Sequence, residues 1–297
     1  MEIIFLGTSC DYATPTREPV TVLVRIRNRL NILFDCHPSI LKQLWRAGAD
    51  PLDIDVVLIS HRHIGHCMGI PFLIWGNFVK GRRRDLVIFI PEDQALNAFI
   101  KISMELLPIE TERKRQYNIR LITLPSKRGV VTLNDILPEG TNMKLAEQVV
   151  VHYAPLLHGY TNEVNMGYAV HFTKSDVKIA YIIDTEPCRN AIDLARGADV
   201  LIHDAAFERR ALNWAREIKH STAEDAAKVA KEAGVKILVL THIHASREGR
   251  KDFAHVLLEE AKKIFDGIII VPNDLDVLDL MAYRCERPHY YKNHQDY

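Results

Sequence analysis

The 297-residue sequence predicts an α/β fold built in layers, and three observations lead to this prediction. Short, almost wholly apolar runs return along the chain, as expected for strands that are buried on both faces of a sheet. Helical patterns lie between the later runs, and a strand–turn–strand pattern precedes them. Strands that alternate with helices behind antiparallel strands indicate stacked layers of sheet and helix.

The first part of the chain is expected to supply strands and one helix. The predicted strands are residues 2–7, 20–26, 30–35 and 54–60. The second and third of these form a hairpin whose turn is residues 27–29. A helix is predicted over 39–48 and ends at Gly48. Its expected apolar face consists of Ile40, Leu41, Leu44 and Trp45.

The second part of the chain shows regular alternation. The predicted strands are residues 178–184, 199–204, 236–242 and 267–271, and the predicted helices are 93–107, 221–234 and 251–267. Ser221 and Glu224 are expected to form a capping box that begins the helix 221–234, and Gly234 is expected to end it. Because periodicity is lost after about residue 280, we expect one domain over 1–280 and a C-terminal tail over 281–297.

Composition narrows the class of protein. Lys plus Arg and Asp plus Glu each number 38, so the net charge does not by itself indicate a nucleic-acid partner. No apolar run approaches the roughly 20 residues that span a bilayer. The N-terminus resembles a first strand, with no basic region ahead of an apolar one as in a signal peptide. Five scattered cysteines favour the reducing cytoplasm over a disulfide framework.

Histidine and aspartate side chains follow the predicted strands at their C-terminal ends. The stretch LISHRHIGHCMG places His61, His63 and His66 directly after one apolar run. Other runs end at or just before His158, Asp184, Asp204 and His242. A lone histidine at a strand end is usually only a hydrogen-bonded polar group, but three within six residues crowd together unless something binds them. Because α/β sheets place their sites at these strand ends, we expect a site for zinc, manganese or iron.

These motifs resemble the metallo-β-lactamase family and, within it, the ribonuclease Z branch, from FLGTS to about residue 280. The family pattern His-x-His-x-Asp-His falls on His61, His63, Gly65 and His66. The stretches LFDCH, LLHG, IIDT and LTHIH match the family at Asp35, His158, Asp184 and His242. LIHDAAF and KHST resemble ribonuclease Z at Asp204 and His220. The resemblance implies a four-layer αββα sandwich.

The resemblance also implies a role for each matched residue. His61, His63 and His158 would hold one Zn²⁺ or Mn²⁺, and His66 and His242 a second, with Asp184 bridging them and Asp35 in support. A hydroxide held by the metals would attack phosphorus. His220, oriented by Asp204, would then protonate the leaving oxygen. Alternatively, His220 only caps the helix that follows it.

Gly65 departs from the pattern, because the family has a metal-binding Asp there and glycine supplies no oxygen. The second metal is therefore expected to bind more weakly. Loss of a base or orienting group costs on the order of 10²–10⁴ in rate. An inactivating substitution and a natural variant with one working metal both remain open as explanations.

The resemblance implies an RNA partner, such as the 3′ end of precursor tRNA, or a smaller phosphodiester, and a homodimer. Only residues 159–183 separate His158 from Asp184, which leaves no room for the basic arm of many bacterial members. The basic runs 81–84, 112–116 and 246–251 could follow a phosphate backbone or be solvated surface. Hydrolysis of a lactone or sulfate ester, and a catalytically silent metal-binding protein, are the alternative functions.

Overall fold

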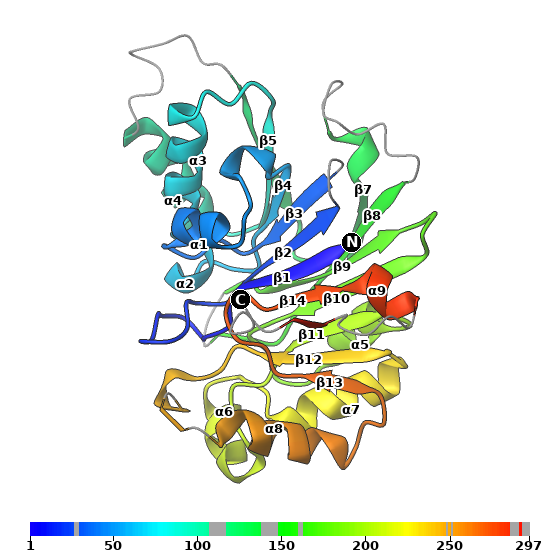
Figure 1. Cartoon of the computed structure of the whole chain (residues 1–297). Coiled ribbons are helices and arrows are strands. Elements are labelled where there is room, and N and C mark those ends of the chain that lie inside the picture. Colours follow the sequence, from blue (N-terminus) through cyan, green and yellow to red (C-terminus); the bar gives the residue numbers. More distant parts are fainter. Residues whose placement is uncertain are drawn as a thin grey trace.

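Two β-sheets lie face to face, and helices cover both outer faces (Figure 1). The computed structural model describes residues 1–26, 30–106, 117–137, 148–159, 163–247, 249–250, 252–285 and 291–292. The arrangement of helix, sheet, sheet and helix confirms the predicted α/β class and the four-layer αββα sandwich. The hairpin turn 27–29 lies outside the described residues.

The first sheet combines an antiparallel and a parallel part. In order across the sheet its strands are β15 (Tyr291–Lys292), β14 (Val277–Asp279), β1 (Glu2–Gly7), β2 (Thr21–Ile26), β3 (Leu30–Phe34), β4 (Val56–Leu58), β5 (Leu86–Pro91) and β6 (Ile119–Leu124). β2 and β3 pair antiparallel, as the predicted hairpin requires. From β3 to β6 the strands run parallel, so their C-terminal ends share one edge of the sheet.

The second sheet contains the strands that alternate with helices. In order across the sheet these are β13 (Ile268–Ile270), β12 (Ile237–Thr241), β11 (Val200–Asp204), β10 (Val177–Ile182), β9 (Met166–Phe172), β8 (Val149–Pro155) and β7 (Gly129–Thr132). β10 to β13 are parallel, whereas β7 to β10 pair antiparallel. The four predicted strands of this half are all present, although β12 and β13 are one residue shorter than expected at both ends.

Helices pack on the outer face of each sheet. The first sheet is covered by α1 (Ile40–Arg46), α3 (Ile70–Val79) and α4 (Gln94–Leu106), and the second by α5 (Arg189–Ala195), α7 (Ala223–Ala233) and α8 (Phe253–Lys262). The remaining helices are short: α2 (Ile64–Cys67), α6 (Leu212–Glu217) and α9 (Leu280–Arg284). Between the sheets lies a core of aromatic and branched side chains that includes Phe5, Phe34 and Tyr181.

Two local predictions about helices are wrong. The capping box of α7 is formed by Thr222 and Asp225, one residue later than predicted. The hydroxyl of Ser221 is instead directed at the backbone carbonyl of Thr185, to which it donates at 2.6 Å. Trp45, expected on the apolar face of α1, is 57% exposed. Gln43 is turned inward instead, where its amide donates to a backbone carbonyl of β1.

Part of the predicted tail joins the first sheet. β15 pairs antiparallel with β14, and the hydroxyl of Tyr291 donates to the carboxylate of Asp276. The division into a domain over 1–280 and a tail over 281–297 stays a prediction. Among the described residues, no helix combines the length and apolar character needed to cross a membrane.

Candidate metal centre

The predicted site residues meet where the C-terminal ends of strands from both sheets come together. Asp35 follows β3, the three histidines 61, 63 and 66 follow β4, and His158 follows β8. Asp184 follows β10, Asp204 ends β11, and His242 follows β12. Edges of parallel sheet collect side chains in this way.

Three of these residues have an unusual backbone. Asp35, Asp184 and His242 have φ values of 59°, 52° and 63°, in the left-handed region that non-glycine residues seldom adopt. Each conformation costs on the order of 1–3 kcal/mol and persists only where the surrounding structure enforces it. All three follow directly, or after one or two residues, the end of a buried strand.

The first cluster consists of His61, His63 and His158, whose ligand atoms lie within 4.8 Å of one another. The structure thus brings together the three residues predicted for the first metal, and their role as ligands stays a prediction. The hydroxyl of Ser60 lies 3.0 Å from Nδ1 of His61. Nε2 of His63 lies 3.1 Å from the carboxylate of Glu163, which the sequence had not indicated. Such partners fix the orientation of a metal-binding imidazole.

The second cluster consists of Asp11, His66, Asp184 and His242, again within 4.8 Å of one another. Oδ2 of Asp184 lies 3.0 Å from Nε2 of His66 and 3.1 Å from Nε2 of His242. Asp11 is the member that the sequence did not predict, and its Oδ1 lies 3.4 Å from Nε2 of His66. Asp184 is also 3.9 Å from His61, so it connects the two clusters.

The donor atoms of both clusters fit a metal. Buried ligand atoms without a hydrogen-bond partner include Asp11 Oδ1, His61 Nε2, His63 Nδ1, His66 Nε2, both ring nitrogens of His158, both carboxylate oxygens of Asp184 and His242 Nε2. Buried polar atoms rarely stay without partners. Donors at about 2.1 Å from a tetrahedral zinc are about 3.4 Å apart, close to the spacings around His66. Imidazole nitrogen and carboxylate oxygen therefore form a site suited to zinc or manganese.

The two clusters differ in electrostatics. Burial, and then the neighbouring His66, lower the pKa of His61 well below its usual range. Burial opposes protonation of His66 and His242 as well, but the charge of Asp184 raises the pKa of both well above the usual value. Burial would raise the pKa of Asp184, yet His242 and His66 hold it well below the ordinary range. Burial thus prevails at His61 in the first cluster, whereas the neighbouring carboxylates outweigh it at His66 and His242 in the second.

Asp35 supports both clusters from behind. Its carboxylate accepts from the backbone N–H of Ser60 at 2.7 Å, from the Ser60 hydroxyl at 2.8 Å and from the Tyr181 hydroxyl at 2.7 Å. It also lies 2.8 Å from Nδ1 of His66. Because that contact occupies Nδ1, Nε2 of His66 is the nitrogen directed at Asp184.

His220 and Asp204 form a pair beside the clusters. Nδ1 of His220 donates to Oδ2 of Asp204 at 2.7 Å, and its ring stacks at 5.1 Å on that of His242. Burial lowers the pKa of His220, but the Asp204 carboxylate outweighs it and the pKa is raised. Asp204 itself is fixed by the backbone N–H groups of Thr185 and Ala206. The alternative that His220 caps α7 is wrong, because Thr222 holds that position.

The basic runs are partly used inside the protein. Arg82 is only 2% exposed and donates to several backbone carbonyls, so it cannot contact a phosphate backbone. Arg247 and Arg250 each lie 3.1 Å from Glu208. The run 112–116 lies outside the described residues. Arg82 is also not part of a solvated surface, which was the other possibility for these basic runs.

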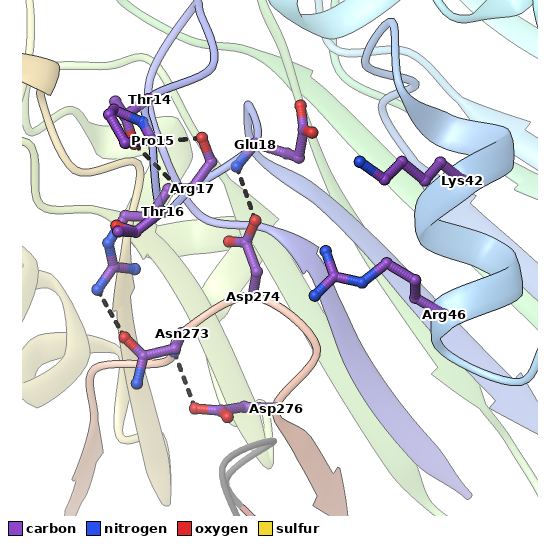
Figure 2. A pocket seen from close by; sticks show the side chains of 10 residues that line it. All are labelled: Thr14, Pro15, Thr16, Arg17, Glu18, Lys42, Arg46, Asn273, Asp274 and Asp276. Atoms are coloured by element: carbon purple, nitrogen blue, oxygen red, sulfur yellow. Dashed lines mark hydrogen bonds between the residues drawn. The ribbon is translucent and has the colours of Figure 1, made fainter.

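A pocket of about 290 Å³ lies next to the loop that carries Asp11. Figure 2 shows Lys42 and Arg46 of α1 pointing toward Glu18 and Asp274 across it. Asp274 accepts from the backbone N–H of Glu18 at 2.7 Å (Figure 2). Arg17 donates to the backbone carbonyl of Pro272 at 2.8 Å. The polar side chains here hold the loop in place.

Comparison with known proteins places the chain among metal-dependent hydrolases. A family model described as "Beta-lactamase superfamily domain" matches residues 30–243. Ribonuclease Z of Methanosarcina mazei is 31% identical over 93% of this chain and 97% of its own length. Ribonuclease Z of Methanosarcina acetivorans is 32% identical over 96% of this chain and 100% of its own length.

Solved structures show the same fold. Human tRNase Z, short form, superposes with a TM-score of 0.70 at 24% identity, covering 94% of this chain and 98% of the human chain. A metallo-β-lactamase fold protein of Bacillus subtilis also has a TM-score of 0.70, at 20% identity, covering 93% and 98% of the two chains.

Proposed function

The chain belongs to the ribonuclease Z family of the beta-lactamase superfamily, and from this premise we propose that it is a metal-dependent phosphodiesterase that cleaves RNA. The 3′ end of precursor tRNA is the candidate substrate, because the relatives are named ribonuclease Z and tRNase Z. The observation that carries the proposal is the His220–Asp204 pair next to two clusters of unpartnered His and Asp atoms.

We propose Zn²⁺ for both clusters, with Mn²⁺ as the alternative. A bound metal pair would supply a nucleophilic hydroxide near neutral pH and polarise the phosphate oxygens. His61, His63 and His158 would be the ligands of one ion and His66 and His242 those of the other, with Asp184 shared between the two.

His220 has the features of a general acid. Because Asp204 accepts from Nδ1, the other ring nitrogen is free to hold a proton toward the substrate. The raised pKa of His220 keeps that proton on the ring at higher pH than for an ordinary histidine. An alkoxide leaving from phosphorus needs a proton. The His220–Asp204 pair can supply that proton, which fits a phosphodiester substrate.

We expect His220→Ala to slow cleavage of precursor tRNA on the order of 10²–10⁴-fold. Hydrolysis of bis(p-nitrophenyl) phosphate should fall much less, because nitrophenolate leaves without a proton. The measurement is the rate on both substrates with added Zn²⁺ or Mn²⁺. His171→Ala serves as the control with unchanged rates, because this half-buried residue of β9 contacts the exposed Asp176 and belongs to neither cluster.

Equal losses on the two substrates would contradict a general-acid role for His220. Activity on lactones or sulfate esters without phosphodiester cleavage would favour the alternative function, the hydrolysis of such esters. Bound metal with no turnover on any substrate would favour the catalytically silent protein.

A homodimer and a cytoplasmic location complete the proposal. All five cysteines are free, which suits a reducing compartment. Light scattering of the purified protein tests the dimer, and fractionation of the source cells tests the location.

A further inference from the structure

The loop between β1 and β2 carries Asp11 to the second cluster. The backbone N–H of Cys10 donates to the carbonyl of Ile243 at 3.0 Å, directly beside His242. The N–H groups of Thr8 and Ser9 both donate to the carbonyl of Glu18, which closes the loop at its base. Asp11 is therefore held at the site by backbone contacts within its own loop and to the residue that follows His242.

The carboxylate of Asp11 is aimed at the clusters. Its Oδ1 lies 3.4 Å from Nε2 of His66 and 3.6 Å from Nδ1 of His63. Both distances exceed the usual 2.7–3.2 Å of a hydrogen bond to nitrogen, and this oxygen has no other partner although it is buried. Hydrogen bonding therefore does not explain why Oδ1 of Asp11 points at His66, whereas a metal ion bound by both side chains does.

Gly65 leaves the space that Asp11 occupies. A Cβ atom added to Gly65 would lie 2.4 Å from the backbone oxygen of Asp11 and 2.7 Å from its Cα. Any side chain at position 65 would therefore displace the loop. The Cβ of an aspartate at position 65 would lie 2.7 Å from the Cα of Asp11, so the two acidic side chains would begin at nearly the same place.

We infer that Asp11 is the fourth ligand of the metal at the second cluster, and that glycine at position 65 is what admits it. This inference rests on the proposed metal-dependent function. It replaces the expectation that Gly65 leaves the second metal short of a carboxylate. With Asp11 and Asp184 the cluster has two carboxylates and two imidazoles, a complete set for a four-coordinate ion.

The test is metal binding, which needs no turnover. We expect the protein to hold two Zn²⁺ per chain after dialysis, measured by elemental analysis, and two Co²⁺ by titration of the visible absorption. Asp11→Asn, which keeps the shape and removes the charge, should lower affinity for one ion at least tenfold and leave the other unchanged. Tyr12→Ala is the matched control on the same loop, because Tyr12 is 58% exposed, and it should retain both ions.

Gly65 is tested with two variants. Gly65→Ala adds no donor and no charge, yet it should weaken the same ion as Asp11→Asn, because the methyl group displaces the loop. Gly65→Asp should show no gain in affinity over the unchanged protein. If either Gly65 variant does not fold, by circular dichroism and thermal melting, the Asp11→Asn titration alone decides the assignment.

Two outcomes would overturn the inference. One is Asp11→Asn binding both ions, or the only ion present, with unchanged affinity. The other is Gly65→Asp raising both the metal content and the hydrolysis rate. Failure of the proposed function is a separate result, because a protein that loses one ion with Asp11→Asn but cleaves no RNA supports the ligand and rejects the substrate.

Discussion

The two clusters reach a similar arrangement of donor atoms by different means. The first cluster has only imidazoles, and two of its three come from the segment directly after β4. The second has two imidazoles and two carboxylates, and one carboxylate arrives on the loop between β1 and β2. The difference teaches that the donor atoms of a metal site need not all come from one sequence motif, because a distant loop can supply one of them. A gap in one motif is therefore weak evidence of a lost site until the neighbouring loops are inspected.

The largest effect should come from the residue that the clusters share. Asp184→Ala removes the carboxylate within 3.9 Å of histidines in both clusters, so we expect both metals to be lost. Because bound metal supplies several kcal/mol of transition-state stabilisation, phosphodiester hydrolysis should fall on the order of 10³-fold or more. Metal content and rate are measured together, with Asp252→Ala on the exposed end of α8 as control. A variant that keeps one ion would show that the clusters are independent.

An intermediate effect should separate the clusters through their supporting residues. Asp35→Asn removes the charge next to Nδ1 of His66, so affinity at the second cluster should fall about 10–100-fold and affinity at the first should change less. Ser60→Ala removes the hydroxyl next to Nδ1 of His61 and should act mainly on the first cluster. Competitive titration with a chelator resolves the two affinities. The same loss in both variants would mean that the supporting hydrogen bonds act as one unit.

The smallest effect concerns the stability of the fold and should come from His37, a buried histidine outside both clusters. Burial lowers the pKa of His37 to about 3, against about 6.5 when unfolded. Because the folded pKa is the lower one, its contribution to stability is full above pH 6.5 and is lost as the pH falls toward 3, on the order of a few kcal/mol. His37→Asn, which can still accept from the N–H of Ser39, should flatten the fall in melting temperature over this range. An unchanged pH profile would assign the acid sensitivity to other groups.

Much of the fold could be predicted because its signals are local. The buried runs that became β10 to β13 and the left-handed Gly234 at the end of α7 are written in adjacent residues. The capping box is misplaced in the prediction because the stretch STAED offers two overlapping frames, and the sequence does not show that the Ser221 hydroxyl turns toward Thr185.

The same distinction between local signals and tertiary contacts applies to the site. Apart from His220, which lies between α6 and α7, the matched histidines and aspartates come after or at the ends of strands, so their convergence could be expected from the rule for strand ends. Asp11 and Glu163 lie on loops, and nothing near them in the sequence indicates which atoms they meet. The available signal was Gly65 itself, since a glycine in such a cluster can mark the close approach of another backbone.

The left-handed backbone at Asp35, Asp184 and His242 has a consequence for redesign of the fold. Glycine would relax the backbone at each position, but it would also remove the side chain. At Asp35 it would leave the hydroxyls of Ser60 and Tyr181 without the carboxylate that accepts from them, and a buried donor without a partner costs about 1–3 kcal/mol. The usual stabilising exchange of a strained residue for glycine is therefore closed at this position.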